Sequence, residues 1–66
     1  MNWKTGSSGK MITARHNDTE YVVVFMNQKW SLFSRHAGLP GTLYPLKSNC
    51  ETSKEAIQFA EDIIKF

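Results

Sequence analysis

The sequence predicts an α+β domain: a three-stranded antiparallel sheet, with a possible short fourth edge strand, and one C-terminal helix packed on one face. Residues 21–26 are the longest apolar run, β-branched and aromatic, and they lie between polar turn-like segments, which favours a central strand. Residues 10–16 and 30–36 flank this strand at the spacing of two tight hairpins. Apolar residues then recur at helical spacing after Thr52.

The 66 residues are enough for one small domain, and the apolar fraction of 41% is typical of a folded protein. The single cysteine, Cys50, cannot form an internal disulfide, which indicates a reducing compartment. The sequence shows no charged-then-apolar leader and no apolar stretch of eighteen residues, so we expect a cytoplasmic protein without a membrane span. The net charge of +2 is too small to indicate a nucleic-acid partner by itself.

The first strand follows a segment rich in glycine and serine. We expect residues 1–9 to form a flexible N-terminal arm without secondary structure, and residues 10–66 to form the single domain. Trp3 is the exception, because an indole usually packs against a core. After the strand at 10–16, Asn17 and Asp18 tolerate the positive φ of a two-residue hairpin turn.

A second turn, at Asn27 and Gln28, leads into the strand at residues 30–36. Two glycines and a proline in residues 37–41 predict a loop. Residues 42–46 are the possible fourth strand, and Pro45 confines it to an edge because proline has no amide hydrogen.

The C-terminal helix begins with a capping box. Thr52 is placed to accept a hydrogen bond from the backbone of Glu55, whose carboxylate reaches back toward Thr52. The face that we expect to pack on the sheet consists of Ala56, Ile57, Ala60, Ile63 and Ile64, flanked by Phe59 and Phe66.

Two-residue turns also determine which side chains share a face of the sheet. The expected rows facing the helix are Ala14, Tyr21 and Ser34; Ile12, Val23 and Leu32; and Lys10, Phe25 and Trp30. The opposite rows are Arg15, Glu20 and Arg35; Thr13, Val22 and Phe33; and Met11, Val24 and Ser31, with Met26 beside Lys29. This second face collects apolar side chains that the helix does not cover.

The candidate partner-binding residues all lie on this second face. They are Met11, Arg15, Val22, Val24, Met26, Lys29, Phe33 and Arg35. The competing interpretation is that Trp3 or the loop over residues 37–46 folds over the apolar side chains, which would then be ordinary core. The sequence leaves both interpretations open.

The reactive side chains form no catalytic motif. In the expected register His16 and His36 both lie opposite Thr19 and are about 10 Å apart, too far to bind one metal ion together. Cys50 precedes a helix N-terminus, where a helix dipole can lower a thiol pKa, but no basic partner supports a nucleophile, so we expect a semi-buried loop cysteine. We expect no enzyme, no cofactor and no metal site.

The function that we expect is non-catalytic binding of a protein through the open face, as a homodimer or as an inhibitor or adaptor. The small size would suit a phage or mobile-element regulator. The alternative is nucleic-acid binding by the same face, with Phe33 stacking on bases and Arg15 and Arg35 contacting phosphates.

Three strands followed by a threonine-capped helix over residues 10–65 resemble, in architecture, the three-stranded DNA-binding domains of plant regulators and integrase arm domains. The resemblance implies a sheet that contacts DNA, and no functional residue follows from it. The centre of the face consists of Val22, Val24 and two methionines, which suit a dry protein contact better than a phosphate backbone. Protein binding is therefore the preferred expectation.

Overall fold

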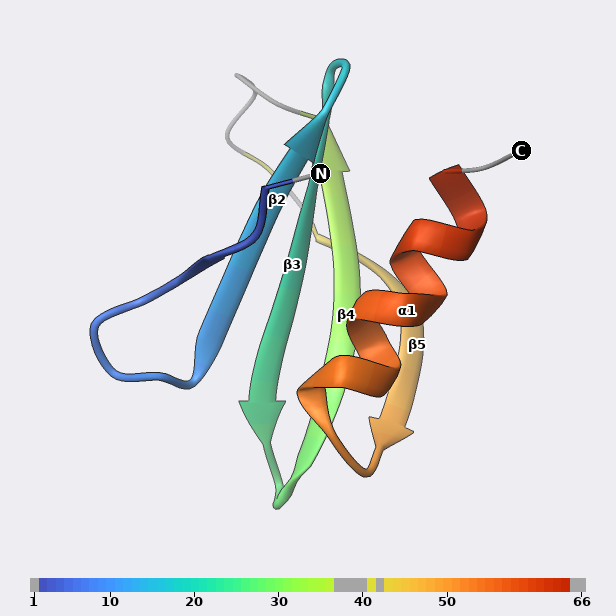
Figure 1. The fold of residues 1–66 in the computed structure, drawn as a ribbon. Coiled ribbons are helices and arrows are strands. Elements are labelled where there is room, and N and C mark those ends of the chain that lie inside the picture. Colours follow the sequence, from blue (N-terminus) through green and yellow to red (C-terminus); the bar gives the residue numbers. More distant parts are fainter. Residues whose placement is uncertain (1, 37–40, 42, 65–66) are drawn as a thin grey trace.

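The computed structural model describes residues 2–36, 41 and 43–64, which form one five-stranded antiparallel sheet and one helix (Figure 1). The strands occur in the order of the sequence: β1 Lys4–Thr5, β2 Met11–His16, β3 Thr19–Met26, β4 Lys29–His36 and β5 Tyr44–Cys50. The helix α1, Ser53–Ile64, packs against β3, β4 and β5. The α+β class is confirmed, but the expected three strands understate the sheet.

The register expected for the three central strands is confirmed. Val23 lies between Ile12 and Leu32, and Glu20 lies between Arg15 and Arg35. The loops at 17–18 and 27–28 each contain two residues, and φ is 55° at Asn17, 51° at Asn27 and 64° at Gln28. Because the side-chain period of a strand is two, these short turns fix the face of every side chain in β2, β3 and β4.

The two edge strands differ from expectation. The fourth strand exists, but β5 begins at Tyr44 and continues to Cys50 instead of covering residues 42–46. Its pairing with β4 shifts register on either side of Leu32, and Asn49 has a φ of 59°. Such irregularities break the alternation by which a strand is recognised in a sequence. Pro45 lies opposite Phe33 in this edge strand, as its missing amide hydrogen requires.

Residues 1–9 were expected to have no secondary structure, and this is wrong at β1. Lys4 pairs with Thr13 and Thr5 with Ile12. A turn reverses the chain between β1 and β2, with Gly6 N–H donating to the Met11 carbonyl at 2.7 Å and Gly9 N–H donating to the Gly6 carbonyl at 3.0 Å. Two further expectations concern residues that the structure does not describe. They are the loop over residues 37–41, of which only residue 41 is described, and Phe66 as a flank of the helix face.

The helix begins where the capping box predicts. Glu55 N–H donates to Thr52 Oγ1 at 3.2 Å, while the Glu55 carboxylate accepts from the backbone N–H of Glu51 at 2.8 Å, one residue earlier than expected. Twelve residues long, α1 is too short to cross a bilayer, and no other helix occurs among the described residues.

The core lies between α1 and the sheet. Val23, Leu32, Ala56 and Ala60 are completely buried, and the two alanines allow the helix to approach the strands closely. Ile57, Ile64, Trp3 and Trp30 pack around this centre. The expectation for Ile63 is wrong: this side chain is 38% exposed, because the helix is rotated so that Ile57 and Ile64, not Ile63, flank the two alanines.

Candidate interaction surface

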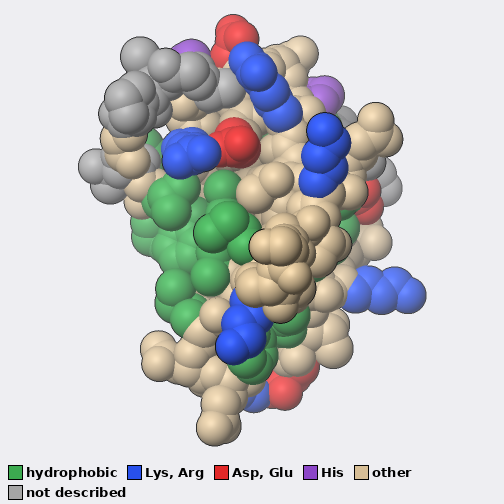
Figure 2. Space-filling view, turned by 90° about the vertical axis from the view of Figure 1, so that its left-hand side faces the viewer, with side chains coloured by type: hydrophobic (Ala, Val, Ile, Leu, Met, Phe, Trp, Pro, Cys, Tyr) green, Lys and Arg blue, Asp and Glu red, His purple; other side chains and the backbone are tan. Residues whose placement is uncertain are grey.

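The outer face of the sheet, defined as the face turned away from α1, carries the predicted apolar side chains together. We call this group the outer patch: Met11, Val22, Val24, Met26 and Phe33. In Figure 2 hydrophobic side chains gather over the left part of the view, on the side away from the helix, with basic and acidic side chains directly above them. The apolar rows and the charged row therefore adjoin, as the register predicts.

Exposure is uneven within the outer patch. Met11 and Met26 are 47% and 41% exposed, whereas Val24 and Phe33 are half-buried. Val22 is only 4% exposed, so it contributes to packing within the sheet and offers little surface to a partner. The two methionines, at the end of the sheet where β3 turns into β4, are the accessible part of the patch.

Among the described residues, the outer face carries the cations Lys4, Arg15, Lys29 and Arg35, and the last two are paired within the chain. Arg35 Nε forms an ion pair with Glu20 Oε1, and Lys29 Nζ forms one with Glu51 Oε1. The expected arrangement of Glu20 between two guanidinium groups holds for the backbone register, but its carboxylate pairs with Arg35 alone. Within the described part of the chain, Arg15 and Lys4 form no ion pair.

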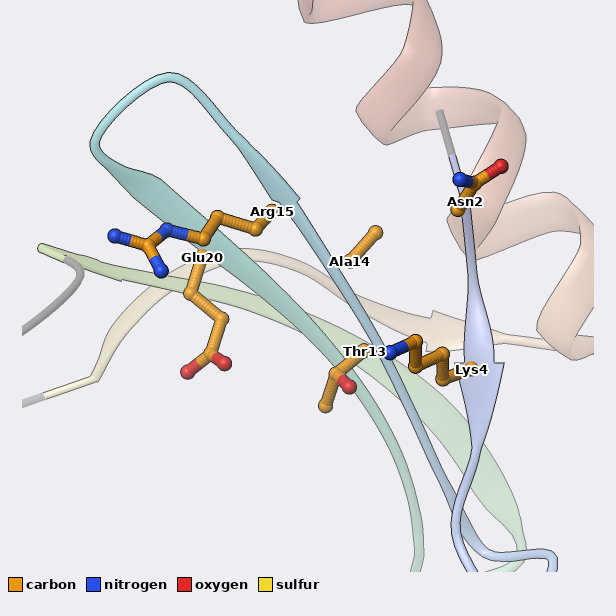
Figure 3. A pocket seen from close by; sticks show the side chains of 6 residues that line it. All are labelled: Asn2, Lys4, Thr13, Ala14, Arg15 and Glu20. Carbon is orange, nitrogen blue, oxygen red and sulfur yellow. The ribbon is translucent and has the colours of Figure 1, made fainter.

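A shallow groove of about 550 Å³ lies at the β1–β2 edge of the sheet, lined by Asn2, Lys4, Thr13, Ala14, Arg15 and Glu20 (Figure 3). Pairing between β1 and β2 stops at Lys4 and Thr13, and the groove begins where the two segments separate. Figure 3 shows the Arg15 and Glu20 side chains on one side of β2, while Ala14 points toward the helix side. Asn2, Lys4 and Thr13 were missed as site residues because β1 was not predicted.

Several exposed apolar side chains lie outside the outer patch. Phe25 is 37% exposed and packs against Trp30 at the margin of the core, with 5.1 Å between the ring centroids. Phe59 is 36% exposed, and Lys47 Nζ lies 5.3 Å from the centroid of its ring. Tyr44, on the edge strand β5, is 63% exposed. The sequence pattern assigned Phe25 and Phe59 to the core or its flank, because it cannot resolve how far the helix extends over the sheet.

The reactive side chains remain dispersed. His16 and His36 both lie opposite Thr19 on separate strands, as the register predicts. Among the described residues, no three histidine, cysteine or acidic side chains are placed to bind a metal ion together.

Cys50 was expected to be a semi-buried loop cysteine, and the structure places it in a strand instead. It is the last residue of β5 and is 1% exposed. Burial raises the pKa of its thiol, the charge of Glu55 raises it further, and Lys47 opposes the rise. A buried, protonated thiol is a packing group and a poor nucleophile.

Comparison with protein-family models, with curated proteins and with solved structures gave no match. The inference of function therefore depends on the geometry of the outer face.

Proposed function

We propose that this protein is a small, non-catalytic binding module that contacts another protein through the outer patch, acting in the cytoplasm as a homodimer or as an inhibitor or adaptor. The observation that carries the proposal is the exposure of Met11 and Met26, beside Val24 and Phe33, on the sheet face opposite the helix. A contiguous apolar area on a small soluble domain is typical of an interaction site.

The chemistry of the outer patch suits a protein partner. Thioether and aliphatic side chains lose little by desolvation, and methionine adapts its shape to the opposing surface. The surrounding Arg15 and Arg35 would form a polar rim, which contributes to orientation and to the rate of association more than to affinity.

The test compares two equally exposed apolar side chains on opposite faces of the molecule. Met26, in the outer patch, is 41% exposed, and Ile63, on the helix, is 38% exposed. We expect Met26→Asp to abolish self-association in sedimentation, or capture of a partner from the native host identified by mass spectrometry, because a buried unpaired carboxylate costs several kcal/mol. Ile63→Asp should bind as the wild type does.

Thermal unfolding of both variants separates binding from folding. We expect their melting temperatures to stay close to that of the wild type, because both side chains already contact solvent. Normal binding by Met26→Asp would contradict the proposal, as would equal loss from both variants. A third variant, Val24→Asp, tests the half-buried centre of the patch: if it unfolds the isolated protein, this part of the patch is core.

Nucleic-acid binding by the same face is the second candidate, and the uncompensated charges of Lys4 and Arg15 favour it. Phosphate contacts make affinity fall steeply with salt, whereas an apolar interface barely responds. Under this alternative, Arg15→Ala and Arg35→Ala would abolish binding of an oligonucleotide, and Met26→Asp would leave it unchanged.

A further inference from the structure

We propose that the occupant of the outer face is an acidic protein surface, which covers the outer patch and inserts a carboxylate side chain into the groove beside Lys4. This inference rests on the proposed function and specifies the chemistry of the partner.

The outer face carries positive charge that the chain does not balance. Lys4 lies opposite Thr13, which belongs to an outer row, so Lys4 shares this face with Arg15, Lys29 and Arg35. Lys29 and Arg35 are neutralised by Glu51 and Glu20. The charges of Lys4 and Arg15 remain, and both residues line the groove of about 550 Å³, in which the acidic lining residue, Glu20, is paired with Arg35. An opposing surface needs negative charge to match them.

The groove also offers hydrogen-bond donors. Every second residue of β2 directs its backbone N–H and carbonyl toward β1. These residues are Met11, whose carbonyl accepts from Gly6 N–H, and then Thr13 and Arg15. Because the β1 pairing ends at Thr13, the backbone N–H of Arg15 is directed into the space that the groove occupies. The Lys4 ammonium group and this N–H are donors that suit a carboxylate, while the Arg15 guanidinium, which Figure 3 shows directed away from Lys4, adds positive charge at the rim of the groove.

A second copy of the chain matches this face poorly. A two-fold dimer places the same face on itself, so two faces of net positive charge would meet. Three of the acidic residues, Glu55, Glu61 and Asp62, are on α1, in the other layer of the molecule. Glu20 and Glu51 already pair with Arg35 and Lys29, which leaves Asp18, in the turn between β2 and β3. Charge complementarity therefore favours a different, acidic protein.

Apolar neighbours favour a protein over a phosphate backbone. Met11, in β2, lies two residues from Thr13 in the groove, and Val24 lies opposite Met11. A segment that alternates acidic and apolar side chains would place the former in the groove and the latter on the patch.

The test uses a fluorescein-labelled peptide that alternates glutamate and valine, with a matched peptide in which lysine replaces glutamate. Binding is measured by fluorescence anisotropy, and the site is mapped by amide chemical shifts. We expect the double variant Lys4→Gln, Arg15→Gln to weaken binding of the glutamate peptide by about tenfold or more. The control double variant Lys10→Gln, Lys54→Gln removes two exposed charges elsewhere and should stay within about twofold of the wild type.

Four results would overturn the inference: no binding of the glutamate peptide, equal binding of the lysine peptide, equal loss in both double variants, or shifts confined to α1. Tighter binding of an oligonucleotide would identify a nucleic-acid site instead, and self-association that Met26→Asp removes would identify a second copy. Any partner captured from the host is tested with the same variants. If Met26→Asp loses it and Lys4→Gln, Arg15→Gln retains it, the inference fails and the proposed function stands. If Met26→Asp retains it, both fail.

Discussion

At the scale of single residues, Cys50 shows how position decides chemistry. A thiol just before a helix N-terminus is a candidate for activation by the helix dipole. Here the side chain lies in the core cluster with Leu32 and Ala56, and burial, followed by the charge of Glu55, raises its pKa. The raised pKa keeps the thiol protonated at neutral pH, so Cys50 contributes by packing.

Alkylation and pH dependence test this role. We expect iodoacetamide to modify Cys50 far more slowly in the folded protein than in urea. Since the folded pKa lies above the unfolded one, the contribution of Cys50 to stability is fully present below about pH 8.5, and is lost as the pH rises from there through the folded pKa. Urea denaturation between neutral and alkaline pH should show this slope, and Cys50→Ala should lack it. Equally fast alkylation of folded and unfolded protein would refute the assignment.

Two adjacent isoleucines provide a second test at this scale. Ile64 packs against the core cluster, whereas Ile63 is 38% exposed. We expect Ile64→Ala to lower the free energy of unfolding by about 1–3 kcal/mol, less than a fully buried site would lose, and Ile63→Ala by less than about 1 kcal/mol. Chemical denaturation measures both. Equal effects would mean that the helix is rotated differently in solution.

At the scale of elements, the hairpin turns hold the sheet in register. Gln28 has a φ of 64°, in a region where most side chains are strained by contact with the backbone, and asparagine tolerates this region better. We expect Gln28→Gly to raise the free energy of unfolding by about 0.5–1 kcal/mol, as measured by urea denaturation. The matched control, Gln58→Gly, lies within α1 and should be destabilising by a similar amount. A loss of stability from Gln28→Gly would show that the turn does not carry this strain.

An element can be predicted from the sequence when the interactions that form it are local, and not when they join residues distant in the sequence. Two-residue turns and strict alternation act locally, so the pairings of Val23 and Glu20 could be read directly from the sequence. The strand β1 could not, because Lys4 and Thr5 have no apolar pattern and depend on contacts with β2. The bulged pairing of β5 likewise has no local signature.

The candidate site likewise contains residues that the sequence could place and residues that it could not. Met11, Val24 and Met26 were placed on the outer face because their positions follow from the register alone. The groove at Lys4 depends on how the N-terminal segment folds back, so it appeared only in the structure. The register also does not give the exposed fraction of a side chain. Val22 was therefore expected at the surface, whereas it is buried in the structure.

At the scale of the whole molecule, a 66-residue domain has little core, and segments that cover its edge become important. Trp3 packs against the core cluster, and its Nε1 donates to Glu61 Oε2 on the helix at 3.4 Å. The N-terminal segment thus joins the sheet edge to α1, two elements that are distant in the sequence. Composition alone indicated a flexible arm here.

Removal of residues 1–5 tests whether the N-terminal segment stabilises the domain or is a flexible arm. We expect the shortened chain to lose about 2 kcal/mol or more, because it gives up the half-buried indole and the pairing of β1. It also exposes the backbone of β2 at Ile12 and Thr13, and an uncovered strand edge promotes association. Urea denaturation and light scattering measure the two effects separately.

Trp3→Phe is the matched control, since it removes the hydrogen bond to Glu61 and retains most of the packing, and it should lower the free energy of unfolding by less than about 1 kcal/mol. If the shortened chain unfolds at the same urea concentration and remains monomeric, the segment contributes nothing to the core and is the flexible arm that its composition suggests.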